Sequence, residues 1–134
     1  MLKISCGNIG EMNDYWTEQA QYDLDTAKAM LESGRYLYVL FCCQQAVEKS
    51  LKAIIAERTG ELPPRLHQLM RLSRVAELEV DEQRADFLRE LSAYYIQTRY
   101  PEEIMDIASR VKKDEAARVL KQTQETVTWL KSIK

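Results

Sequence analysis

Apolar residues return at helical spacing along the first part of the chain. Between residues 13 and 33 one appears every three or four positions, which predicts an amphipathic helix. Its apolar residues are Trp16, Ala20, Leu24, Ala27 and Leu31. Asn13 or Asp14 can cap the start of this helix, and Gly34 can end it. Residues 35–59 are apolar on most sides, so the second predicted helix belongs at the centre of a helical bundle.

Glycine and proline residues divide the next part of the chain. Gly60 can end the second helix. The Pro63–Pro64 pair predicts a loop, because a proline ring disfavours helical geometry for the preceding residue. We expect a short helix over residues 66–76 and a longer one over residues 81–100, which Pro101 would end. The longer helix would carry one face made of Phe87, Leu88, Leu91, Tyr94, Tyr95 and Thr98.

The end of the chain predicts one more helix. Residues 102–113 fit either a loop or a helical turn, and Asp114 can cap a helix that runs to the C-terminus. Its apolar face would consist of Ala117, Leu120, Val127, Leu130 and Ile133. No strand-like alternation is present. The pattern therefore predicts an all-α fold, an up-and-down helical bundle of four long helices plus one short helix. We expect a single helical domain over residues 13–134, preceded by a flexible tail at residues 1–12.

The composition is that of a globular protein without a strongly basic footprint. Of the 134 residues, 46% are hydrophobic and 30% are charged, and the formal net charge is −2. A nucleic-acid binder usually carries an overall positive charge, so the whole chain does not indicate one. Residues 110–134 nevertheless carry seven lysines and arginines against three acidic residues. We interpret this segment as a solvated basic face, with a phosphate-facing surface as the alternative.

The cysteine and histidine content excludes several classes of site. Three cysteines and one histidine are present, and no CxxC motif occurs, so neither a disulfide framework nor a zinc site is expected. The N-terminus lacks the pattern of a signal peptide, and no apolar run is long enough to span a membrane. Glycine-rich phosphate loops and HExxH motifs are absent as well. We expect a reduced, cytoplasmic protein with no metal, no cofactor and no membrane association.

A polar stripe runs along the second predicted helix, in the segment QQAVEKSLKA. Gln45, Glu48, Lys49 and Lys52 recur at positions i, i+3, i+4 and i+7, which places them on one helical face. The stripe fits an exposed salt-bridged face, an internal polar network, or a cleft or subunit interface that binds a ligand. If exposed, the Glu48–Lys52 pair would contribute about 0.2–0.5 kcal/mol.

A second candidate site is the segment YYIQTRYP, residues 94–101, with Tyr95, Arg99 and Tyr100 as candidate ligand contacts. Arg99 has three plausible roles. Its guanidinium can bond the last carbonyls of the preceding helix, pair with Glu48 across the bundle, or hold a phosphate in a bidentate fork.

Arg65 and His67 form a further candidate pair, next to the start of the short predicted helix. Helix N-termini favour anions, so the pair indicates a phosphate site. The alternative is that His67 caps or packs the helix. A single histidine without a nucleophilic serine or cysteine motif does not build a catalytic triad.

These segments together resemble a known family, the prokaryotic HEPN domain. The similarity rests on YWTEQAQYDLDTAKAML, FCCQQAVEKSLKAII, LPPRLHQL, YYIQTRYPEE and EAARVLKQTQETVTWLKS, and it covers the chain from about Tyr15 to Lys131. The resemblance implies an all-α bundle that commonly forms a homodimer. It also implies a small nucleotidyltransferase partner, frequently in a toxin–antitoxin pair, and nucleotide binding. Many members of the family are metal-independent RNases.

The RNase members of the family carry an arginine followed four to six residues later by a histidine. Arg99 matches the arginine, but no histidine occurs after His67, so we assign no catalytic residue. The leading hypothesis is a HEPN-type module that dimerises, acts with a nucleotidyltransferase and binds a nucleotide or RNA phosphate. One alternative is a divergent metal-independent RNase toxin of a toxin–antitoxin pair, using Arg99 with tyrosines or Glu48. The other is a purely structural interaction protein whose polar stripe is internal.

Overall fold

The structure is a computed structural model that describes residues 9–97 and 99–133. The described residues form six helices and no strand, which confirms the all-α prediction. The helices are α1 (Ile9–Glu32), α2 (Tyr36–Thr59), α3 (Leu69–Val75), α4 (Glu82–Ser92), α5 (Pro101–Arg110) and α6 (Lys113–Ile133). Three of them are long and three are short, where four long helices and one short helix were predicted.

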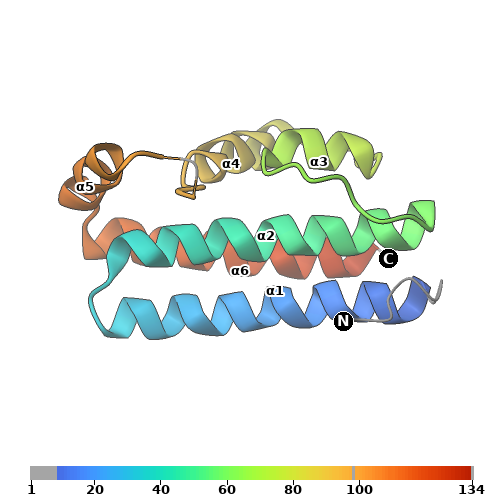
Figure 1. The fold of residues 1–134 in the computed structure, drawn as a ribbon, viewed down its shortest axis with the longest axis horizontal. Coiled ribbons are helices and arrows are strands. Elements are labelled where there is room, and N and C mark those ends of the chain that lie inside the picture. Colours follow the sequence, from blue (N-terminus) through green and yellow to red (C-terminus); the bar gives the residue numbers. More distant parts are fainter. Residues whose placement is uncertain (1–8, 98, 134) are drawn as a thin grey trace.

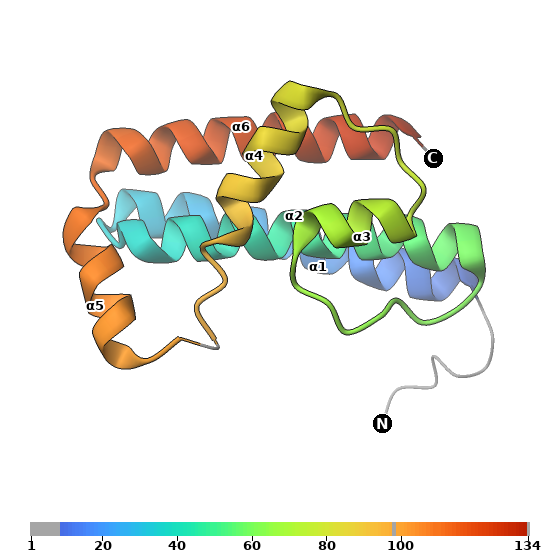
Figure 2. The same ribbon diagram turned by 90° about the horizontal axis from the view of Figure 1, so that it is seen from above.

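The three long helices run side by side, and the short helices lie over one face of them and at one end (Figure 1). α1 forms one outer layer, and α2 with α6 forms the middle layer. α3 and α4 form the opposite layer, with α5 at one end of the molecule. Seen from above, α4 crosses α2 and α6 at a steep angle (Figure 2). α1 runs antiparallel to α2, whereas α6 runs parallel to it, so an up-and-down order holds only for α1 and α2.

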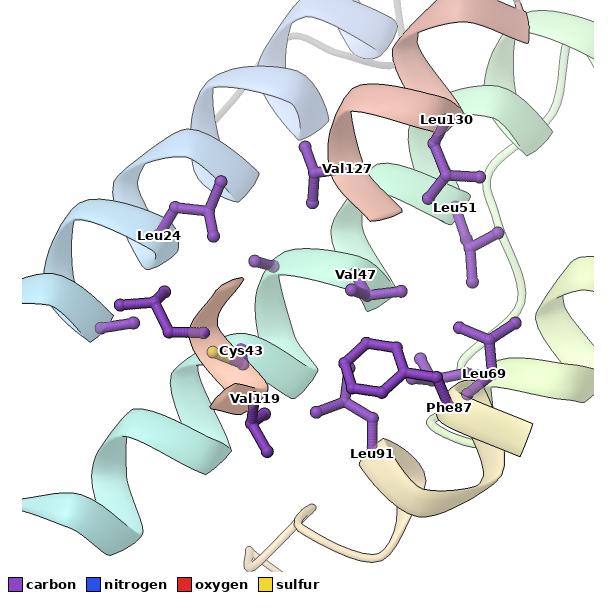
Figure 3. Close-up of a cluster of buried hydrophobic side chains, with 14 of the residues drawn as sticks. Leu24, Cys43, Val47, Leu51, Leu69, Phe87, Leu91, Val119, Val127 and Leu130 are labelled. Carbon is purple, nitrogen blue, oxygen red and sulfur yellow. The ribbon is translucent and has the colours of Figure 1, made fainter. Parts of the chain in front are cut away.

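The core lies around α2, as its apolar composition predicts. Val47 and Leu51 of α2 are fully buried, and their neighbours in the core come from every layer (Figure 3). These neighbours include Leu24, Leu69, Phe87, Leu91, Val119, Val127 and Leu130. The helix ends where the sequence indicates, at Gly60, whose φ of 71° is favourable for glycine and whose N–H donates to the carbonyl of Ala56.

The first and last helices differ slightly from their predicted bounds. α1 begins at Ile9, before the predicted cap residues, so helix reaches into the segment predicted as a tail; residues 1–8 lie outside the described part. α6 begins at Lys113, one residue before Asp114. Its buried alanine is Ala116, whereas Ala117 is exposed. The predicted Ala117 is therefore replaced by Ala116, one position earlier, whereas the predicted Leu120, Val127 and Leu130 are buried.

The segment around Pro101 departs most from the prediction. α4 ends at Ser92, not near Tyr100, and Pro101 begins a separate helix, α5. Proline suits the first position of a helix because its missing N–H has no intrahelical acceptor there. The Glu103 carboxylate accepts a hydrogen bond from the Tyr100 N–H at 2.9 Å, which caps the new helix. Thr98, predicted on the apolar face of the longer helix, lies outside the described residues.

Cys42 and Cys43 are free thiols on α2. Burial is the main cause that raises the pKa of Cys42 to about 11 and that of Cys43 to about 12. Both therefore stay protonated at neutral pH. Cys6 lies outside the described residues. Among the described helices, none combines the length and hydropathy needed to cross a membrane.

Candidate functional site

Glu48 is the centre of a buried polar cluster on α2. Its side chain is only 5% exposed and accepts hydrogen bonds from Gln44 Nε2 and Lys52 Nζ, each at 3.0 Å. His67 Nδ1 lies 3.2 Å from both carboxylate oxygens of Glu48. The carboxylate thus has donors from two turns of its own helix and from the loop before α3. These contacts satisfy the hydrogen-bonding capacity of a carboxylate that is shielded from water.

His67 joins three parts of the chain. It lies in the connection between α2 and α3, and its carbonyl accepts a hydrogen bond from Gln44 Nε2 at 3.2 Å. Its ring stacks on Tyr95, which follows α4, with ring centroids 4.0 Å apart and planes 12° from parallel. The ring is therefore held at one edge by Glu48 and over one face by Tyr95. Even so, the His67 side chain remains 41% exposed.

Lys49 and Lys52 are also paired inside the protein. Lys49 Nζ lies 2.9 Å from a carboxylate oxygen of Asp23 on α1. Burial is the main cause that raises the pKa of Asp23, and the neighbouring Lys49 opposes it. Lys52 pairs with Glu48 and also lies over the ring of Trp16, 5.6 Å from its centroid.

The polar stripe on α2 is thus an internal network rather than an exposed salt-bridged face. Gln45 is half-buried and donates from Nε2 to Gln44 Oε1 at 2.8 Å, which connects it to the Glu48 cluster. Gln44 was not among the sequence candidates, although it is fully buried and bonds both Glu48 and His67. Its position four residues before Glu48 was the signal that could have found it.

The 93–100 loop, between α4 and α5, places the other candidates near the surface. Arg99 Nη2 donates to the carbonyl of Ala93 at 2.7 Å, next to the end of α4, and Nη1 lies 3.7 Å from Glu103. Arg99 therefore bonds a helix-end carbonyl, one of its three predicted roles, and the predicted pairing with Glu48 is not present. Tyr100 is 75% exposed.

Tyr95 has a more enclosed position in the same loop. Its hydroxyl donates to Gln97 Oε1 at 3.0 Å, and its ring packs against Phe41 at a centroid distance of 6.1 Å. Desolvation, followed by the nearby Glu48 charge, raises the pKa of Tyr95, so this phenol is neutral at physiological pH.

A hollow of about 430 Å³ lies between the 93–100 loop, α5 and the start of α6. Arg99 and Arg110 line it together with the carboxylates of Glu103, Asp106 and Glu115. The lining therefore carries both positive and negative charges, and two of them, Arg110 and Asp106, already form an ion pair at 2.7 Å. Arg99 has the looser carboxylate partner of the two arginines.

Arg65 does not take the position predicted for it at a helix start. α3 begins at Leu69, and Gln68 caps it by accepting the Arg71 N–H at 3.0 Å. Arg65 is exposed in the preceding loop, and His67 contacts Glu48 instead of an anion site. The predicted helix start at residue 66 is therefore corrected to Leu69, because the side chain of Gln68 caps the helix there, and the phosphate role of Arg65 and His67 stays a prediction.

Comparison with known proteins identifies the fold and the family. The structure of TT1696 from Thermus thermophilus is similar with a TM-score of 0.76 and 29% sequence identity, covering 90% of this chain and 96% of that one. ST0689, described as an archaeal HEPN homologue, has a similar fold with a TM-score of 0.64 and 21% identity, covering 90% and 95%. A search among curated proteins gives no match. The family model for the HEPN domain matches residues 14–133, and the chain therefore belongs to the HEPN domain family.

Proposed function

We propose that this HEPN protein binds a nucleotide or an RNA phosphate through the 93–100 loop, as a homodimer that acts with a small nucleotidyltransferase. The observation that carries the proposal is the different placement of the two groups of candidate residues. Glu48, Lys49 and Lys52 form close ion pairs inside the protein, whereas Arg99 is half-buried with a loose carboxylate partner and Tyr100 is exposed. The loop is therefore the better ligand contact.

Arg99 is suited to exchange its carboxylate partner for a phosphate. The Glu103 side chain is 52% exposed, and at 3.7 Å it forms a loose ion pair with Arg99. Such exposed pairs contribute about 0–1 kcal/mol, so a ligand loses little by displacing one. A phosphate offers the guanidinium two parallel charge-assisted hydrogen bonds. The exposed ring of Tyr100, next in the chain, can stack on a base.

Arg99→Ala is expected to weaken binding of a fluorescein-labelled single-stranded oligoribonucleotide by about 10- to 100-fold, because it removes charged hydrogen bonds to phosphate. Fluorescence anisotropy gives the dissociation constants. Arg89→Ala is the matched control, since Arg89 on α4 is exposed and paired with Asp86. Its replacement changes the net charge of the protein by the same amount as Arg99→Ala. Equal weakening by both variants would show that only net charge matters and that the loop is not the site.

The proposed homodimer uses α5. This helix has no buried residue, and Met105 is 70% exposed while Ile104 and Ile107 are half-buried. Its first two turns carry Glu102, Glu103 and Asp106, whereas Arg110, Lys112 and Lys113 lie at and after its end. An antiparallel pair of α5 helices around a twofold axis therefore places acidic residues of one copy opposite basic residues of the other. Light scattering measures the mass that tests this arrangement.

The proposed nucleotidyltransferase partner rests on membership of the HEPN family. If a nucleotidyltransferase is encoded next to this gene, we expect the two proteins to co-purify after co-expression when only the nucleotidyltransferase carries an affinity tag. An unrelated tagged protein of similar size serves as the control. Recovery of this chain with neither or with both baits would count against a specific complex.

A second candidate is a purely structural interaction protein, favoured by the internal pairing of the α2 stripe. That function requires no ligand at the 93–100 loop. The same anisotropy experiment distinguishes the two candidate functions, because a purely structural protein would bind no oligoribonucleotide.

A further inference from the structure

Two tyrosines of α1 are exposed along one side of the helix. Tyr15 is 37% and Tyr22 is 69% exposed, and no described residue forms a hydrogen bond with either hydroxyl group. They are seven positions apart, which places them on the same side of an α-helix and about 10.5 Å apart along its axis. Tyrosine is enriched at protein interfaces, because its ring supplies a large contact area and its hydroxyl group a polar contact.

An acidic residue follows each tyrosine at the same spacing. Glu18 comes three positions after Tyr15 and Asp25 three positions after Tyr22, and both acidic residues are exposed. Residues three apart are neighbours on a helix surface, so each ring has a carboxylate beside it. Neither carboxylate forms an ion pair with a described residue, although Asp25 accepts a hydrogen bond from Gln21 Nε2 at 3.0 Å. Tyr15, Glu18, Tyr22 and Asp25 together form a tyrosine–acid stripe.

The tyrosine–acid stripe lies on the side of α1 that faces away from the rest of the protein. α1 is an outer layer, and its inner side packs against α2 (Figure 1). Leu24 belongs to that buried side, and Tyr22, two positions earlier, lies about 160° from it around the helix. The stripe also shares no residue with the 93–100 loop or with α5. A partner bound to the stripe therefore leaves both of those proposed surfaces free.

The charge of α1 determines which partners fit the tyrosine–acid stripe. The helix carries six acidic residues and a single basic one, Lys28. Such a surface repels nucleic acids and anionic lipids, and it attracts lysine and arginine. A lysine or arginine can place its charged group over a tyrosine ring and pair with the carboxylate beside that ring. Each tyrosine with its acidic neighbour is thus a subsite for one basic side chain.

The distance between the two subsites indicates the secondary structure of the partner. About 10.5 Å is the rise of seven residues in an α-helix, and residues seven apart lie on nearly the same side of it. A helix packed along α1 with basic residues at positions i and i+7 therefore reaches both subsites. A second copy of this chain does not supply such a helix, because no described helix has two basic residues seven positions apart.

We propose that the outer side of α1 is a docking surface for a basic α-helix of a different protein. Arginines or lysines at i and i+7 of that helix bind the Tyr15–Glu18 and Tyr22–Asp25 subsites. The cation over each ring and the ion pair beside it hold the partner helix in one register along α1. This docking surface does not depend on a ligand at the 93–100 loop.

Two isomeric peptides test the spacing. Both are acetylated, amidated, alanine-based helices with two arginines, placed seven positions apart in one peptide and five in the other. Arginines five apart point about 140° away from each other, so that peptide fills one subsite at a time. NMR titrations of ¹⁵N-labelled protein are expected to show about 3- to 10-fold tighter binding of the seven-spaced peptide. The chemical-shift changes should concentrate on α1.

A double variant tests the residues. Tyr22→Ala combined with Asp25→Asn removes one subsite, and we expect it to reduce the affinity for the seven-spaced peptide to that for its isomer. Tyr38→Ala combined with Glu125→Gln is the matched control, because it removes an exposed tyrosine from α2 and an exposed carboxylate from α6. The control variant changes the net charge by the same amount and should bind like wild type.

Several results would overturn the docking surface. Equal affinity of the wild-type protein for both peptides would show that overall charge alone attracts them, and binding of neither peptide would leave no docking surface. Shift changes centred on the 93–100 loop or α5, or the same loss in both double variants, would place the contact elsewhere. None of these measurements uses RNA, so the proposed function can fail while this inference stands, and the reverse also holds.

Discussion

Replacing Glu48 with alanine is expected to lower the free energy of unfolding by about 3–5 kcal/mol, because the change leaves a buried positive charge without its partner. The Lys52 side chain is only 8% exposed, and Glu48 is its ion-pair partner at 3.0 Å. The substitution also removes an acceptor from Gln44, which is fully buried. Urea denaturation followed by far-UV circular dichroism measures the loss.

Two further variants distinguish the buried network from an ordinary loss of charge. Glu125→Ala removes an exposed carboxylate from α6 and should change the stability by no more than about 0.5 kcal/mol. Combining Glu48→Leu with Lys52→Met removes both buried charges and should restore much of the stability, since apolar replacements for a buried ion pair are often neutral. If Glu48→Ala were as stable as Glu125→Ala, the network would have no role in holding the fold.

Met105→Asp is expected to convert the proposed homodimer into a monomer. Met105 is 70% exposed on α5, near the middle of the helix, where an antiparallel pair would bring the two copies of this residue close together. Two aspartates facing each other in an interface repel, at a cost of several kcal/mol, which corresponds to a rise of about 100-fold or more in the dimer dissociation constant. Size-exclusion chromatography with light scattering gives the mass directly.

Tyr22→Asp is the control for the dimer experiment. Tyr22 is 69% exposed on α1, so the substitution replaces a similarly exposed large side chain with the same charged residue on a different helix. We expect this variant to keep the wild-type mass. A wild-type protein that is monomeric at high micromolar concentration, or a Met105→Asp protein that stays dimeric, would contradict the assignment of α5 as the interface.

The fold was largely predictable from the sequence because the long helices carry strong local signals. The α1 stripe from Ala20 to Ala27 is buried as its spacing indicates, and Gly60 ends α2 as predicted. The segment around Pro101 was less predictable, since proline can end one helix or begin the next. The side chain of Glu103, which bonds the Tyr100 N–H, decides between these outcomes in favour of a new helix.

The candidate site was only partly predictable, because its contacts join residues that are distant in the chain. Helical spacing correctly grouped Glu48 and Lys52, but it could not show that they face the inside of the protein. Their environment depends on Trp16 of α1 and on the loop that carries His67. The stack of His67 on Tyr95 has no sequence signal at all, since 28 positions separate the two residues.

The sequence by itself determined that this protein is helical, which face of each long helix is apolar, and its resemblance to the HEPN family. These properties depend on residues three or four positions apart, which the helical period relates directly. Only the tertiary structure decided the partners of the polar groups: Glu48 with His67, and Arg99 with the end of α4. Such pairings depend on how helices and loops cross, because burial and charge compensation are set by neighbours in space.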